Sequence, residues 1–108
     1  MNLGLAQEIF ANYQKHGWQL RRVLTLTLTE EEHHQIAEAF PHATIVQAEI
    51  DALWFARAAS AGREAWELRL AAEQPYALFE AFEADESEDD REDARREMEN
   101  KMREYMTR

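Results

Sequence analysis

Two extended stretches joined by a short turn constrain the fold of this chain most. Residues 44–58 and 64–71 are predicted to be strands, and Ser60-Ala61-Gly62 marks the turn between them. A turn at Ser60-Ala61 gives three cross-strand pairs: Phe55 with Trp66, Leu53 with Leu68, and Arg57 with Glu64. This register puts five apolar side chains on one face of the hairpin: Leu53, Phe55, Trp66, Leu68 and Leu70. The other face then holds Trp54 with Glu67 and Arg69.

Two helices are predicted in the N-terminal half of the chain. Residues 3–16 place apolar side chains at helical spacing, and Asn2 is suited to the N-cap position. Gly17 can adopt the left-handed conformation that commonly ends a helix. The segment Thr29-Glu30-Glu31-Glu32 forms a capping box, which opens a second helix that ends at about Phe40.

Three further segments complete the predicted elements. Residues 18–28 alternate between apolar and polar side chains and indicate a strand. Residues 76–82 fit either a strand or a short helix, and we favour the strand. Residues 88–106 are predicted to form a helix whose apolar stripe has five members: Ala94, Met98, Met102, Tyr105 and Met106.

The order of these elements indicates an α+β fold, because consecutive antiparallel strands are flanked by helices. We expect a small antiparallel sheet of about four strands, a β-meander, packed by two helices from the N-terminal half and followed by a C-terminal helix. The long stretch 44–58 is expected to break near Glu49-Ile50-Asp51. Residues 1–82 form the predicted globular domain. Residues 83–108 hold an acidic segment and an amphipathic helix that packs on the same domain or on a second copy.

The charge of the chain excludes several classes of function. Its 22 Asp and Glu residues outnumber its 12 Lys and Arg residues, which gives a net charge of −10. Nucleic acids and anionic membranes repel such a chain, so we expect no binding to either. The absence of cysteine excludes disulfides and thiol chemistry. No apolar run approaches the roughly 18 residues of a membrane span, and no signal peptide is recognisable, so we expect a cytoplasmic protein.

Residues 83–93 contain eight acidic side chains and one arginine, Arg91. One interpretation is a solvated helix start, since acidic residues in the first turn complement the helix dipole. A second is a docking surface for a basic protein, and the third and most specific is mimicry of nucleic acid in the basic groove of a DNA-binding protein.

Five residues are candidates for contacts with a protein partner: Trp54, Met98, Met102, Tyr105 and Met106. The methionines are adaptable apolar groups on a helix that follows a charged segment, so they suit packing on the domain, on a second copy or in the groove of a partner. Trp54 is either covered by the C-terminal helix or exposed as an aromatic anchor.

Four charged residues are candidates for a polar cleft: Arg22, Asp51, Arg57 and Glu67. Arg22 and Asp51 both fall among apolar positions of their strands, and buried charges need partners. We therefore expect Arg22 to pair with Asp51 or Glu49 across the sheet, unless a bulge turns it outwards.

The sequence favours a non-catalytic protein-interaction or regulatory domain, acting through an acidic, apolar-striped surface. The partner is a different protein or a second copy, and we favour a homodimer because small domains gain stability by association. The alternative is a small enzyme or ligand-binding protein that uses the polar cleft. We expect no catalytic residue, no cofactor and no metal site, because no spacing matches an established motif.

Overall fold

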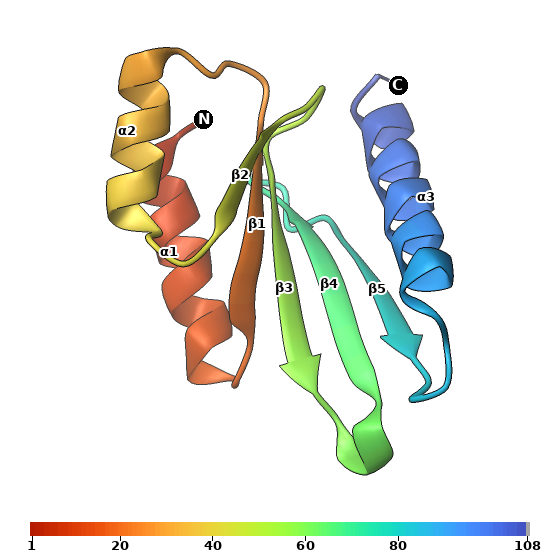
Figure 1. Cartoon of the computed structure of the whole chain (residues 1–108). Helices are drawn as coiled ribbons and strands as arrows, with labels where there is room; N and C mark the ends of the chain where they lie inside the picture. The colour runs from red at the N-terminus through yellow and green to blue at the C-terminus, as the bar shows by residue number, and fades with distance from the viewer. Residues whose placement is uncertain (108) are drawn as a thin grey trace.

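The computed structural model describes residues 1–107 and combines three α-helices with a five-stranded sheet (Figure 1). Arg108, the last residue of the predicted C-terminal segment, lies outside the described residues. The elements in chain order are α1 (Leu3–Lys15), β1 (Gln19–Thr25), α2 (Glu30–Ala39), β2 (Thr44–Gln47), β3 (Ala52–Ala58), a 3₁₀ turn (Ser60–Gly62), β4 (Glu64–Leu70), β5 (Ala77–Phe82) and α3 (Glu88–Met106). None of the helices described is long and apolar enough to cross a membrane.

The strand order is β2-β1-β3-β4-β5, and the sheet is mixed. β1 pairs in parallel with β2, whereas the pairs β1–β3, β3–β4 and β4–β5 are antiparallel. The predicted α+β class is confirmed, but a four-stranded antiparallel meander was wrong. The break expected near residues 49–51 separates β2 from β3, which lie on opposite sides of β1. Helix α2 provides the crossover that a parallel pair requires.

Local signals placed the helix ends correctly. The Asn2 side chain accepts a hydrogen bond from the Leu5 amide at 3.0 Å, and the Thr29 hydroxyl accepts one from the Glu32 amide at 3.2 Å. Gly17 has φ +83°, as expected for a residue that ends a helix. The strand favoured for residues 76–82 is confirmed as β5, and the helix predicted for residues 88–106 is confirmed as α3.

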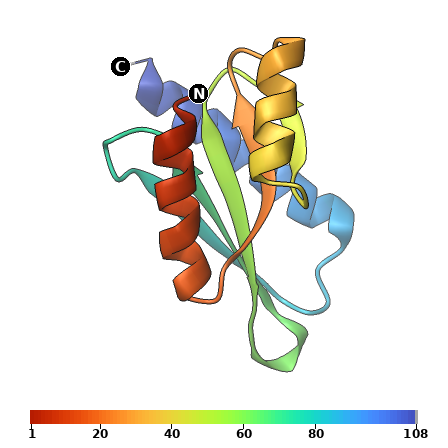
Figure 2. The same ribbon diagram turned by 90° about the vertical axis from the view of Figure 1, so that its left-hand side faces the viewer.

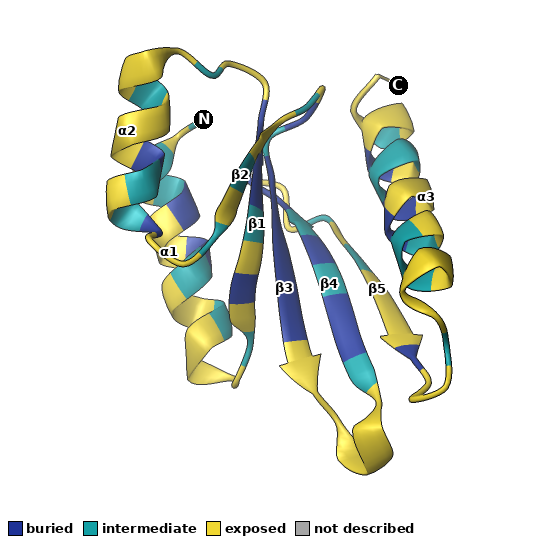
Figure 3. Ribbon diagram, viewed as in Figure 1, coloured by how far each residue is buried: buried dark blue, intermediate teal, exposed yellow. Residues whose placement is uncertain are grey.

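Helices cover both faces of the sheet. α1 and α2 lie on one face (Figure 2), and α3 lies on the other (Figure 1). The core under α1 and α2 includes Val23, Leu53 and Phe55, whereas the core under α3 includes Trp54 and Leu68. Figure 3 shows β3 buried through most of its length, whereas β5, at one edge of the sheet, is largely exposed.

The predicted register of the β3–β4 hairpin was wrong by one residue. In the structure Ala56 pairs with Trp66, and Trp54 pairs with Leu68. The turn is longer than expected because Ala61 and Gly62 both have positive φ, 61° and 75°. A one-residue shift moves side chains to the opposite face of a sheet. Trp54 therefore shares the α3 side with Trp66 and Leu68, and the α1 side receives Leu53, Phe55, Glu67 and Arg69.

A bulge in β1 changes the direction of a second set of side chains. The pairing of β1 with β3 shifts between Leu20 and Arg22. Leu20 and Val23 belong to the core under α1 and α2, whereas Leu24 belongs to the core under α3. Arg22 also faces α3, where its guanidinium meets Glu92. The bulge therefore places a charged side chain in the α3 layer.

Candidate interaction surface

The apolar stripe of α3 packs on the sheet of its own chain. Met98 and Met102 are buried in the core beneath the helix, and the Tyr105 ring stacks on Tyr76 with centroids 3.8 Å apart. Of the stripe, Met106 alone is largely exposed, at 45%. Trp54 is fully buried, so the exposed-anchor alternative was wrong, and its indole N–H donates to Glu99 of α3 at 2.8 Å. These side chains hold α3 on the sheet.

The partner expected for Arg22 was wrong. Arg22 donates two hydrogen bonds to the Glu92 carboxylate of α3, at 3.0 and 2.8 Å. Asp51 instead accepts a hydrogen bond from the Leu26 amide at 2.9 Å, and Glu49 lies 3.3 Å from Arg103. No local pattern in the sequence indicates that residue 92 lies over residue 22, because the two are far apart in the chain.

A second arginine completes this ion cluster. Arg95 is only 1% exposed and donates to Glu92 at 2.7 Å and to Glu88 at 2.9 Å. Its guanidinium lies 4.1 Å from the centroid of the Trp66 ring. The hydrogen bond from Arg22, together with the bond from Arg95, lowers the pKa of Glu92 to about 2. The hydrogen bond between Arg22 and Glu92 also raises the pKa of Arg22.

Our sequence interpretation missed Arg95, although a signal was present. Arg95, Met98 and Met102 are spaced i, i+3, i+7 and so lie on one face of the helix. The acidic segment 83–93 contributes to the fold of its own chain. Glu88 and Glu92 form ion pairs with arginines, and Ser87 caps the start of α3.

The α1 side of the sheet is less well covered near β5. Tyr13 of α1 stacks on Phe55 of β3, with ring centroids 4.1 Å apart. Further towards the edge, the exposed side chains of β5 on this side are Ala77, Phe79 and Ala81. Phe79 is 56% exposed, and the one ring that it meets in the described part of the chain is that of Trp18, edge-on with centroids 6.4 Å apart. The Phe79 ring therefore presents apolar surface that no other described element of the chain buries.

The backbone of β5 is also free along its outer edge. The Leu70 amide donates to the Tyr76 carbonyl at 2.9 Å, which marks these two residues as a hydrogen-bonded pair. Because such pairs alternate along an antiparallel ladder, Leu78, Glu80 and Phe82 also bond to β4. Ala77, Phe79 and Ala81 therefore direct their N–H and C=O groups away from the sheet. Free edges of this kind pair readily with another strand.

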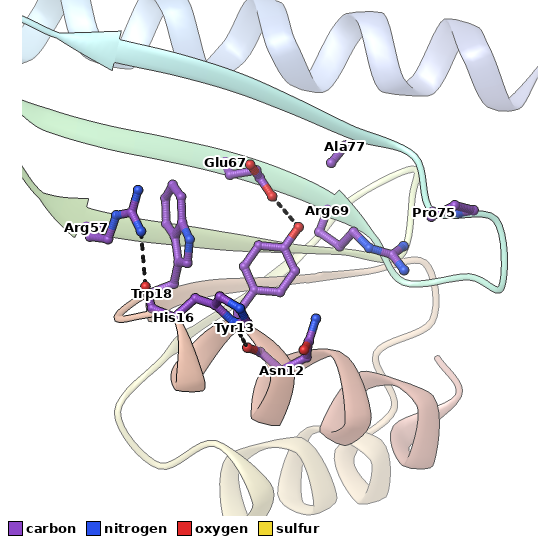
Figure 4. Close-up of a pocket in the computed structure, with 9 residues that line it drawn as sticks. All are labelled: Asn12, Tyr13, His16, Trp18, Arg57, Glu67, Arg69, Pro75 and Ala77. Atoms are coloured by element: carbon purple, nitrogen blue, oxygen red, sulfur yellow. Dashed lines mark hydrogen bonds between the residues drawn. The ribbon is translucent and has the colours of Figure 1, made fainter.

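A hollow of about 440 Å³ lies between α1, β4 and the start of β5 (Figure 4). The Tyr13 hydroxyl donates to the Glu67 carboxylate in its wall; burial and this hydrogen bond raise the pKa of Tyr13 above its ordinary value. Arg57 donates to the His16 carbonyl at 3.0 Å. The predicted polar cleft is thus assembled in part, since the hollow brings together Arg57 and Glu67.

The other two residues predicted for the cleft lie elsewhere. Arg22 is on the α3 side of the sheet, and Asp51 lines a separate hollow beside Met106. Among residues 1–107 no group of three His, Asp or Glu side chains is arranged to hold a metal ion. Comparisons of the chain with protein-family models, with curated proteins and with solved structures found no match.

Proposed function

We propose that this chain is a non-catalytic interaction domain that pairs with a second copy of itself through the outer edge of β5. The observation that carries the proposal is Phe79, which is 56% exposed on a strand whose outward backbone groups have no partner strand within residues 1–107. The apolar stripe of α3 is not the proposed surface, because Met98 and Met102 are already buried within the chain.

The sequence of β5 suits pairing with itself. A twofold axis relates identical patches, so a self-pairing edge must be complementary to its own reverse. The three residues whose backbone groups point away from the sheet are Ala77, Phe79 and Ala81, and their order Ala-Phe-Ala is the same in either chain direction. Antiparallel pairing centred on Phe79 would place Ala77 against Ala81 of the second copy and the two Phe79 rings side by side. Cross-strand aromatic pairs stabilise a sheet by about 0.2–1 kcal/mol each.

The net charge of −10 gives this association a characteristic salt dependence. Two copies repel each other, and salt screens charges beyond about 10 Å at 0.1 M. Self-association through an apolar edge should therefore strengthen when salt is added. Docking of the acidic face of α3 on a basic surface should weaken instead, because its attraction is electrostatic.

The test is sedimentation velocity of the full chain over a concentration series, at low and moderate salt. Phe79→Lys should abolish the dimer, because it places like charges opposite each other at the centre of the pairing. Leu26→Lys is the matched control, since Leu26 is 53% exposed but lies outside β5. We expect it to leave the dimer intact. Equal effects of the two substitutions, or a monomer at every concentration, would contradict the proposal.

A further inference from the structure

The hollow beside Tyr13 differs in charge from the rest of this acidic chain. Six of the arginines described lie within 4 Å of a carboxylate: Arg22, Arg63, Arg91, Arg95, Arg96 and Arg103. Arg57 and Arg69 have no such partner among residues 1–107, and both line the hollow; Arg21 also has none but lies outside it. Among the described residues that line the hollow, Glu67 is the only one with a carboxylate. The hollow therefore carries more positive than negative charge.

Both arginines are held in place by the chain itself. The Arg57 guanidinium lies 4.6 Å from the centroid of the Trp18 ring, and its Nη1 donates to the His16 carbonyl. The Nη1 of Arg69 donates to carbonyl oxygens of the turn after β4, those of Leu70, Ala72 and Gln74. In each case Nε and Nη2 make no hydrogen bond within the described chain. Each guanidinium thus has N–H donors that remain available to bind an anion.

The arrangement of the two arginines indicates the shape of the ligand. Arg57 and Arg69 lie at opposite ends of the hollow, with Tyr13 and Glu67 between them (Figure 4). The phenol of Tyr13 satisfies one oxygen of Glu67, which reduces its repulsion of an anion. Tyr13 offers aromatic surface in the middle of the hollow, Trp18 lies beside Arg57 at one end, and Pro75 lies beyond Arg69 at the other. A volume of about 440 Å³ is within the range of small-molecule sites.

We propose that this hollow binds a small molecule with an acidic group at each end, one held by Arg57 and the other by Arg69. The middle of the ligand lies beside Tyr13, between the two arginines. Guanidinium groups bind carboxylates through paired, charge-assisted hydrogen bonds, so each end contributes to both affinity and orientation. The proposal does not depend on dimerisation, because the lining residues used here lie outside β5.

The test is a titration of the ¹⁵N-labelled chain, followed by NMR, with three small probes. Terephthalate has a carboxylate at each end of a ring, benzoate has one, and benzamidine carries a positive charge instead. Terephthalate should bind saturably and shift the indole signal of Trp18 and the side-chain signals of Arg57 and Arg69. Benzoate should bind about tenfold more weakly, since one charge-assisted contact is lost, and benzamidine should not bind at the site.

Three variants locate the effect. Arg57→Gln and Arg69→Gln should each weaken terephthalate binding about tenfold. Arg96→Gln changes the net charge equally but lies on the exposed side of α3, so it should bind terephthalate as the unmodified chain does. Overturning results are the absence of saturable shifts at these residues, equal binding of benzoate and terephthalate, or equal weakening by all three substitutions. The readout is ligand binding rather than association, so this proposal and the dimer can fail separately.

Discussion

Replacing Glu92 by glutamine should weaken the contact between α3 and the sheet in a pH-dependent way. Glu92 accepts hydrogen bonds from Arg22 of β1 and from Arg95 of its own helix, so it joins the last helix to the first strand. Glutamine keeps the shape of the side chain but removes its charge. The substitution therefore isolates the ionic part of this contact.

The lowered pKa of Glu92 sets the size of the effect. A change from 4.5 to about 2 corresponds to an upper bound of about 3.5 kcal/mol, at about 1.4 kcal/mol for each pKa unit. The side chain is 38% exposed, so solvent screening reduces the expected contribution to about 1–2 kcal/mol. Because the pKa is lower in the folded chain, this stabilisation is complete above about pH 4.5 and is lost as the pH falls towards 2.

The assay is urea unfolding of the unmodified chain and of the Glu92→Gln variant at pH 7 and at pH 3. The variant should be less stable by about 1–2 kcal/mol at pH 7, and more than half of this difference should disappear at pH 3. Glu97→Gln is the control, since Glu97 is exposed on the same helix and forms no ion pair with the described residues. A difference that stays constant between the two pH values would refute the reasoning.

Two further predictions concern the layer between α3 and the sheet. Arg95→Ala should lower the free energy of unfolding by about 2–3 kcal/mol, because it removes a buried cation with two carboxylate partners. Arg96→Ala, at an exposed position of the same helix, should change the free energy of unfolding by less than about 0.5 kcal/mol. Equal effects of the two substitutions in urea unfolding would contradict this prediction. Ending the chain after Ala84 removes α3, which covers Trp54 and Trp66. Circular dichroism of this shortened chain should therefore show no cooperative thermal unfolding. A cooperative transition like that of the full chain would show that α3 is not part of the core.

Sequence patterns located the helices because the signals that end a helix are local. Asn2, Gly17 and Thr29 act within one turn of their own positions, and the bounds of α3 follow from its apolar spacing and its charges. Strand pairing is not local in this sense. Positive φ at Ala61 and Gly62 lengthened the hairpin turn, and this one-residue difference reversed the faces assigned to Trp54 and Phe55. The parallel pairing of β1 with β2 likewise depends on how α2 packs.

The residues of the candidate sites were predicted only in part, as the strand pairing was. Arg57 and Glu67 were predicted for one cleft, but the predicted register placed them on opposite faces of the hairpin; the one-residue shift in register brings both to the hollow. Arg22 was assigned the wrong partner because its true partner, Glu92, is on a helix whose position over the sheet has no local signal. Phe79 was missed because strand alternation alone does not show which face of β5 lacks a covering helix.

Hydrogen exchange at β5 tests the proposed pairing most directly. The amides of Ala77, Phe79 and Ala81 point away from β4, so in a monomer they should exchange readily with solvent. The measurement compares their exchange, by NMR, below and above the concentration at which the chain associates. We expect these three amides to become about tenfold or more protected in the dimer, while the exposed Leu26 is unchanged. Association that leaves the exchange of all three amides unaltered would contradict pairing through β5.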